Sequence, residues 1–193
     1  MFGSKRGFTR SRGRLTLRLD DAEVTVLRGL LKQFEELVAP TTAATTDPLA
    51  AMVGIDVDSV TPQDPALLRL FPDGYRDDPD AAADFRRFTE RGLRNAKLER
   101  ATVVGAVLEQ FPFDESASDQ TVNAVVVDGD QSQAWLLTCN DLRLVLGSRL
   151  EIVSDDQQVG TDWDSDDDRF QLLSLYQWLT WLQSTLLESL ARR

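Results

Sequence analysis

The chain has 193 residues, of which 42% are hydrophobic and 27% are charged, a globular composition with enough apolar side chains for a core. Its 21 basic and 32 acidic residues give a net charge of −11, so any contact with DNA must come from a local basic patch. The chain contains no histidine and one cysteine. These counts exclude histidine-based catalysis, an intramolecular disulfide and a zinc site built from several thiolates. We therefore expect a protein that is not an enzyme and that has no catalytic residues, cofactor or metal.

Residues 1–13 predict a flexible basic tail, because basic residues alternate there with glycine and serine and no acidic residue occurs before Asp20. The basic residues of this tail are Lys5, Arg6, Arg10 and Arg12. No apolar run is long enough for a secretory signal or a membrane span. We expect residues 14–193 to form a single helical domain in the cytoplasm, since a lone cysteine suits a reducing compartment.

Two short segments predict strands. Residues 14–19 alternate leucines with polar residues, which is typical of a strand with one buried face, and residues 122–127 are the second candidate. Between them, a helix is expected over residues 21–38, with an aspartate N-cap and an apolar residue at every third or fourth position.

The remaining helices are indicated by their caps and their apolar spacing. Asp47-Pro48 and Asp64-Pro65 each place a capping aspartate before a proline, which predicts short helices over residues 48–53 and 65–70. Longer helices are expected over residues 80–111, 132–152 and 170–191. The first of these should have an apolar face that includes Phe85, Phe88, Ala96, Val103, Val107 and Phe111. The second should bury Trp135, Cys139, Leu142, Leu146 and Leu150.

These elements predict a mainly α (α+β) fold. We expect a helical bundle of about four longer helices plus short helices, with a small two-stranded β element. Whether the two strands pair within one chain or across a dimer stays open.

Residues 154–168 contain seven aspartates, which raises the question of a metal site. Asp162, Asp164 and Asp166 have the spacing of a calcium-binding EF-hand loop. That loop needs glycine at its sixth position and glutamate at its twelfth, where this chain has aspartate and leucine. We therefore expect a solvated acidic loop.

Cys139 is the candidate redox residue. A sensor thiol is exposed and close to positive charge, and Arg143 lies one helical turn away. However, Cys139 shares its apolar stripe with Trp135 and Leu142, which favours a buried thiol that acts as a small apolar residue.

The same helix carries a group of polar residues within an otherwise apolar sequence. Asn140, Arg143 and Gly147 fall on one helical face, and Asp141 lies beside them. This group predicts either a buried polar network that fixes helix register or a recognition surface for a partner.

The last helix is apolar around nearly its whole circumference, which indicates a central position or a partner on its second side. Its aromatic residues Tyr176, Trp178 and Trp181 are of the types that anchor interfaces, and Gln183 interrupts the apolar run. We expect a homodimer formed through this helix. No basic recognition helix is present, so we expect no direct DNA binding except through the basic tail.

Four segments, in this order, resemble one known family. They are DPALLRLFPDGYRDD (64–78), FRRFTERGLRNAKLERA (85–101), NDLRLVLGSRLEI (140–152) and YQWLTWLQSTLLESL (176–190). They resemble the actinobacterial domain of unknown function 2017 family, also known as AosR-like proteins, or amino-acid and oxidative-stress regulators. The resemblance covers about residues 15–190.

The resemblance implies a transcriptional regulator of the oxidative-stress response that acts with a sigma factor or RNA polymerase. Family members are typically encoded beside ClpS, the adaptor of the Clp protease, so an accessory role in Clp-dependent proteolysis is the alternative. The family supplies no catalytic residues. A redox switch made by two cysteines cannot operate here, because Cys139 is alone.

Overall fold

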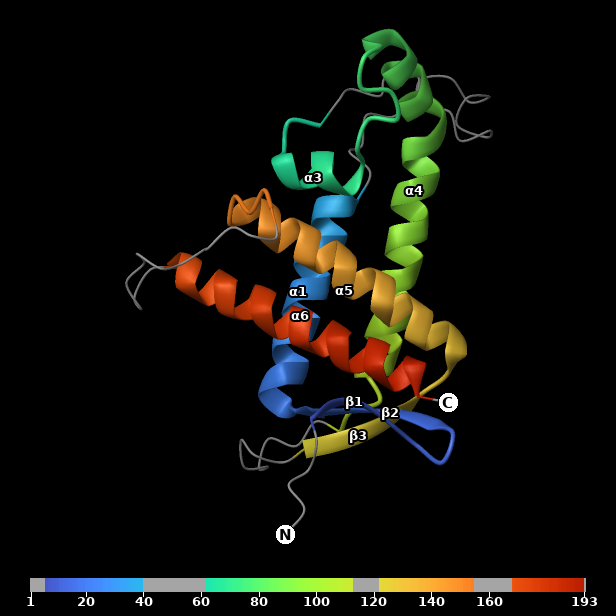
Figure 1. The fold of residues 1–193 in the computed structure, drawn as a ribbon, viewed down its shortest axis with the longest axis vertical. Helices are drawn as coiled ribbons and strands as arrows, with labels where there is room; N and C mark the ends of the chain where they lie inside the picture. The colour runs from blue at the N-terminus through green and yellow to red at the C-terminus, as the bar shows by residue number, and fades with distance from the viewer. Residues whose placement is uncertain (1–5, 40–61, 113–121, 155–167, 193) are drawn as a thin grey trace.

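The structure, a computed structural model, describes residues 6–39, 62–112, 122–154 and 168–192. Its elements are β1 (Gly7–Ser11), β2 (Arg14–Asp20), α1 (Asp21–Val38), α3 (Pro65–Leu70), α4 (Pro79–Leu108), β3 (Val122–Val127), α5 (Gly129–Arg149) and α6 (Asp168–Ala191). Helices α5 and α6 lie side by side, α1 crosses behind them, α4 lies on one flank and the sheet lies at one end (Figure 1).

The mainly α fold class with a small β element is therefore confirmed. The helix expected over residues 48–53 and most of the aspartate-rich segment lie outside the described residues.

The sheet has three antiparallel strands in the order β1-β2-β3, where the sequence analysis predicted two. Leu15 pairs with Val127, and Leu17 pairs with Val125, so the two predicted strands pair within one chain. The alternating leucines of β2 all face the core, as expected.

The expectation of a flexible tail over residues 1–13 is wrong for Gly7–Ser11, which forms β1. Phe8 is 3% exposed, its N–H donates to Thr185 Oγ1 over 3.0 Å, and its carbonyl accepts from Ser189 Oγ over 3.0 Å. Gly7 has φ +77°, and an added Cβ would lie 2.8 Å from Thr185 Oγ1, so the close approach to α6 requires glycine. The alternation of basic and small residues conceals this strand, because the contacts of Phe8 with Thr185 and Ser189 of α6 join segments that are distant in the sequence.

The predicted N-cap of α1 is confirmed. Asp20 Oδ1 accepts from the Glu23 N–H over 2.8 Å, and Glu23 Oε2 accepts from the Asp20 N–H over 2.9 Å. The same motif, formed by Asp128 and Gln131, starts α5 at Gly129, three residues before the predicted start at Ser132. Capping therefore sets both helix starts.

The predicted apolar face of α4 is only partly correct: Val107 is buried, as is Phe111 just after the helix, but three other residues of that face are exposed. Phe85, Phe88 and Val103 are 41%, 53% and 38% exposed, whereas Arg86 and Arg94 are buried. The charges of the two arginines are paired there, because both side chains bind Glu90 over 2.6 Å, Arg86 through Nη1 and Arg94 through Nη2. In the first half of α4, hydrogen-bonded arginine side chains thus occupy buried positions where apolar residues were expected.

The core lies where α5 meets α1, α4, α6 and the sheet. The predicted inner face of α5 is confirmed, since all five of its residues are buried. Leu179, Leu182 and Leu186 of α6 are fully buried. Among the described residues, no helix combines the length and the apolar character that a membrane crossing needs.

Candidate functional site

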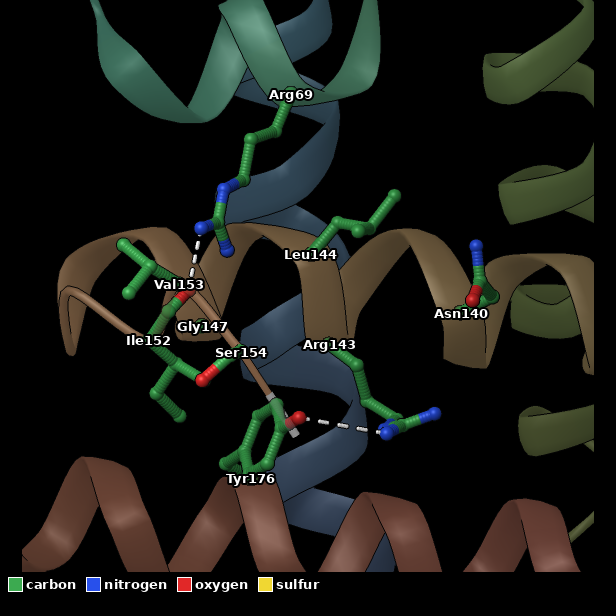
Figure 2. Close-up of a pocket in the computed structure, with 9 residues that line it drawn as sticks. All are labelled: Arg69, Asn140, Arg143, Leu144, Gly147, Ile152, Val153, Ser154 and Tyr176. Carbon is green, nitrogen blue, oxygen red and sulfur yellow. Dashed lines mark hydrogen bonds between the residues drawn. The ribbon is translucent and has the colours of Figure 1, made fainter. Parts of the chain in front are cut away.

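A pocket of about 250 Å³ lies between α3, α5, α6 and the segment that follows α5. Four of the residues singled out in the sequence line it, and Figure 2 shows them with the others. The predicted ones are Asn140, Arg143, Gly147 and Tyr176. The other lining residues are Arg69, Leu144, Ile152, Val153 and Ser154.

Arg143 of α5 ties the pocket to α6. Its Nη1 donates to Gln183 Oε1 over 2.6 Å and its Nη2 to the Tyr176 hydroxyl over 3.4 Å. The guanidinium carbon also lies 5.3 Å from the centre of the Tyr176 ring (Figure 2). Gln183 in turn donates to the Leu136 carbonyl over 3.2 Å. These contacts form a polar network that fixes α5 against α6, and the same guanidinium borders the pocket.

Arg69, which the sequence analysis missed, enters the pocket from α3. Its Nη2 donates to the Ile152 carbonyl, which joins α3 to the segment after α5 (Figure 2). No spacing relates residue 69 to residues 140–147, so only the fold brings the two arginines to one cavity.

Gly147 lies between these groups. A Cβ built on Gly147 would lie 3.5 Å from Arg69 Nη1 and 3.5 Å from Tyr176 Cε2, which is ordinary van der Waals contact. The absence of a side chain therefore leaves space between α3 and α6 at this point of α5.

The remaining interaction candidates lie outside the pocket. Asp141 is 4% exposed and points to α4, where the Lys97 Nζ lies 2.6 Å and the Arg100 Nη2 lies 3.6 Å from its carboxylate oxygens. Trp178 is half-buried against the core. Trp181 is 40% exposed and lies beside Gly7 of β1.

Cys139 is 1% exposed in the core. Burial raises the pKa of its thiol to about 12, although the nearby Arg143 charge acts in the opposite direction. The thiolate, which is the reactive form, is therefore scarce at neutral pH in the folded protein.

The described residues contain no group of three or more carboxylate or thiol ligands that could hold a metal ion. The aspartates with EF-hand-like spacing, Asp162, Asp164 and Asp166, lie outside the residues that the structure describes.

Comparison with known proteins shows relatives over most of the chain. The putative oxidative stress regulator AosR of Mycobacterium leprae is 30% identical over 178 residues, which cover 86% of this chain and 75% of that protein. The oxidative stress regulator AosR of Mycobacterium tuberculosis (strain H37Rv) is 31% identical over 152 residues, which cover 73% of this chain and 65% of that protein, just under two thirds of its length. No solved structure matches the chain. The profile of the family described as "Domain of unknown function (DUF2017)" matches residues 5–190, so the chain belongs to this family.

Proposed function

We propose that this protein is a non-enzymatic regulator that acts by protein–protein contact in the transcriptional control of oxidative-stress and amino-acid responses. The observation that carries the proposal is its similarity to proteins named oxidative stress regulators, which extends over most of the chain. The partner that we propose is a sigma factor or RNA polymerase.

The chemistry of the candidate site supports a role without catalysis. None of the residues that line the pocket in the described part of the chain has a carboxylate, a thiol or an amine side chain. Tyr176 and Ser154 supply hydroxyl groups, but a hydroxyl nucleophile needs an adjacent general base. The buried thiol of Cys139 is equally unsuited to act as a nucleophile or a direct oxidant sensor.

We place the partner contact on the pocket face of α5. Asn140 is exposed at the rim of the pocket, and its side chain has both donors and an acceptor. Recognition of a protein partner by such a rim would leave the half-buried network of Arg143 and Gln183 undisturbed.

The test is capture of the tagged protein with its partners from an actinobacterial lysate, with and without oxidant, followed by reconstitution from purified components. We expect a sigma factor or RNA polymerase to be recovered and to bind the purified protein. Asn140→Ala should weaken that binding, whereas Gln133→Ala, which changes another exposed amide on α5, should not. Absence of both partners from the captured material and from the reconstituted mixture would refute the proposal.

The alternative proposal is an accessory role in Clp-dependent proteolysis. It rests on the location of family genes beside ClpS. Recovery of Clp components in the same capture experiment, in place of a sigma factor, would favour it.

We further propose that the protein is a homodimer formed through α6. Four large apolar side chains of this helix are between 36% and 50% exposed in one chain: Phe170, Trp181, Leu187 and Leu190. A second copy packed on one face of α6 would cover part of this apolar surface, which costs free energy when it is left in water.

A further inference from the structure

We propose that the pocket between Arg69 and Arg143 binds a small organic anion, namely a carboxylate or phosphate group attached to a short apolar body. The binding itself is independent of the regulatory function. Only the role of such an anion as a chemical signal for the regulator rests on the proposed function.

The described lining of the pocket carries positive charge. Two guanidinium groups, from α3 and α5, line one cavity, and none of the described residues that line it is negatively charged. Within the described part of the chain, neither Arg69 nor Arg143 forms an ion pair. Two positive charges beside a partly enclosed space repel each other, and an anion between them removes that repulsion and forms charge-assisted hydrogen bonds.

The two arginines have hydrogen-bonding capacity that their contacts within the protein leave unused. A guanidinium has five N–H donors, and the structure uses Nη2 of Arg69 and both Nη groups of Arg143 for protein contacts. Each Nη group carries two N–H donors, so unused donors remain on both side chains.

The shape and lining of the pocket define the rest of the ligand. Leu144, Ile152 and the Tyr176 ring supply apolar surface, while Asn140 and Ser154 supply groups that can orient a polar ligand. The volume of about 250 Å³ is smaller than the roughly 300–1,000 Å³ typical of sites for drug-sized ligands. The pocket therefore suits a compact metabolite with one acidic group.

Gly147 provides a way to close the pocket without removing a charge. In Gly147→Ala the new methyl group meets Arg69 and Tyr176 at ordinary contact distance, so the fold accommodates it while the space between them is reduced. Alanine also favours the helix more than glycine does. Gly29→Ala on α1, where an added Cβ meets nothing within 4 Å, is the matched control.

The experiment is calorimetric titration of the full chain with four probes: benzoate, phenyl phosphate, inorganic phosphate and the neutral benzyl alcohol. We expect benzoate or phenyl phosphate to bind and benzyl alcohol not to bind. Tighter binding of benzoate would indicate a site for a carboxylate, and tighter binding of phenyl phosphate would indicate a site for a phosphate group. Gly147→Ala and Arg69→Gln should each weaken binding by about tenfold or more, and Gly29→Ala should leave it unchanged.

Unfolding of each unliganded variant is measured in parallel. Weaker binding by Gly147→Ala together with an unchanged or raised melting temperature supports the proposal, because it separates closure of the pocket from damage to the fold. The proposal is overturned if neither organic anion binds, if inorganic phosphate binds as tightly as phenyl phosphate, or if both pocket variants retain full affinity. Partner capture does not depend on these titrations, so a failure here is distinguishable from a failure of the proposed function.

Discussion

The ring of Phe8 lies edge-on to the indole of Trp135, with the ring centres 5.5 Å apart and the ring planes at 74°. This contact joins the first strand to the central helix α5, over more than half the length of the chain. The N-terminal segment is thus part of the hydrophobic core.

Phe8→Ala should lower the free energy of unfolding by about 3–5 kcal/mol, because it leaves a cavity beside Trp135 and removes an aromatic contact. Denaturant unfolding measures this change. Arg10 is exposed in the same strand, so Arg10→Ala should change the free energy of unfolding by no more than about 0.5 kcal/mol.

Removal of residues 1–12 should destabilise the protein more than Phe8→Ala does. An unchanged unfolding midpoint after that removal would mean that β1 is not part of the folded core.

The Lys97–Asp141 pair should behave as a buried ion pair between α4 and α5. Lys97→Met leaves the Asp141 carboxylate buried, with only the more distant Arg100 nearby, and should cost about 3–5 kcal/mol in chemical denaturation. The double variant Lys97→Met/Asp141→Leu should cost less than the sum of the two single changes, because no charge is left unpaired.

Arg192→Met is the matched control for that pair. Arg192 lies 3.8 Å from Glu188, and the two side chains are 70% and 68% exposed. Its removal should have no measurable effect. Equal effects of Lys97→Met and Arg192→Met would contradict the buried pair.

The thiol of Cys139 should be unreactive in the folded protein at pH 7–8 and should react once the protein is unfolded, as measured with a colorimetric thiol reagent.

The stability of the protein should also depend on the ionisation of Cys139. The pKa of its thiol in the folded protein, about 12, lies above the ordinary value of 9.0, so the contribution of the neutral thiol to stability is complete below pH 9 and is lost as pH rises towards 12. The loss should be about 1.4 kcal/mol per pH unit in that window. Cys139→Ala should show a smaller decrease, and identical pH profiles for both proteins would exclude this linkage.

Asp64 should stabilise the protein through both its cap and its charge. It caps α3 by accepting from the Ala66 N–H over 2.8 Å, and its pKa is lowered chiefly by the hydrogen bond from Arg149. Asp64→Ala should cost about 0.5–2 kcal/mol at pH 7, chiefly through loss of the cap, because the half-exposed ion pair contributes little.

Asp64→Asn separates the two effects, since asparagine also caps helices. A lowered folded pKa means that the contribution of the charge is present above the ordinary value of 3.8 and is lost as pH falls below it. The difference in stability between the wild type and Asp64→Asn should therefore decrease below about pH 4. A difference that is constant from pH 7 to pH 3 would show that the charge has no role.

The two tryptophans of α6 should respond differently to truncation. Trp178→Ala should destabilise the chain by about 2–3 kcal/mol, because the ring packs against the core. Trp181→Ala should cost less in unfolding but should shift the sedimentation coefficient from dimer to monomer, since its exposed ring belongs to the proposed interface. Gln177→Ala, an exposed change on the same helix, serves as the control. A wild-type protein that sediments as a monomer at every concentration would refute the dimer.

Part of the candidate site could be predicted from the sequence. The spacing of Asn140, Arg143 and Gly147 places them on one face of a helix, and the structure brings that face to one pocket. The aromatic pattern of the last helix predicts Tyr176 as an interface anchor, and the structure packs its ring against Arg143. Arg69 could not be found, because its relation to the pocket is created by the packing of α3 on α5.

Features that depend on neighbouring residues follow directly from the amino-acid sequence. The capping pairs Asp20–Glu23 and Asp128–Gln131 start α1 and α5, and the alternating leucines of β2 define a buried strand face, because these interactions span only a few residues. Packing between distant segments places Phe8 in the core and brings Arg69 and Arg143 to the same pocket. These relationships join residues that are far apart in the chain, and the free energy that favours them comes from burial of apolar surface in the folded state.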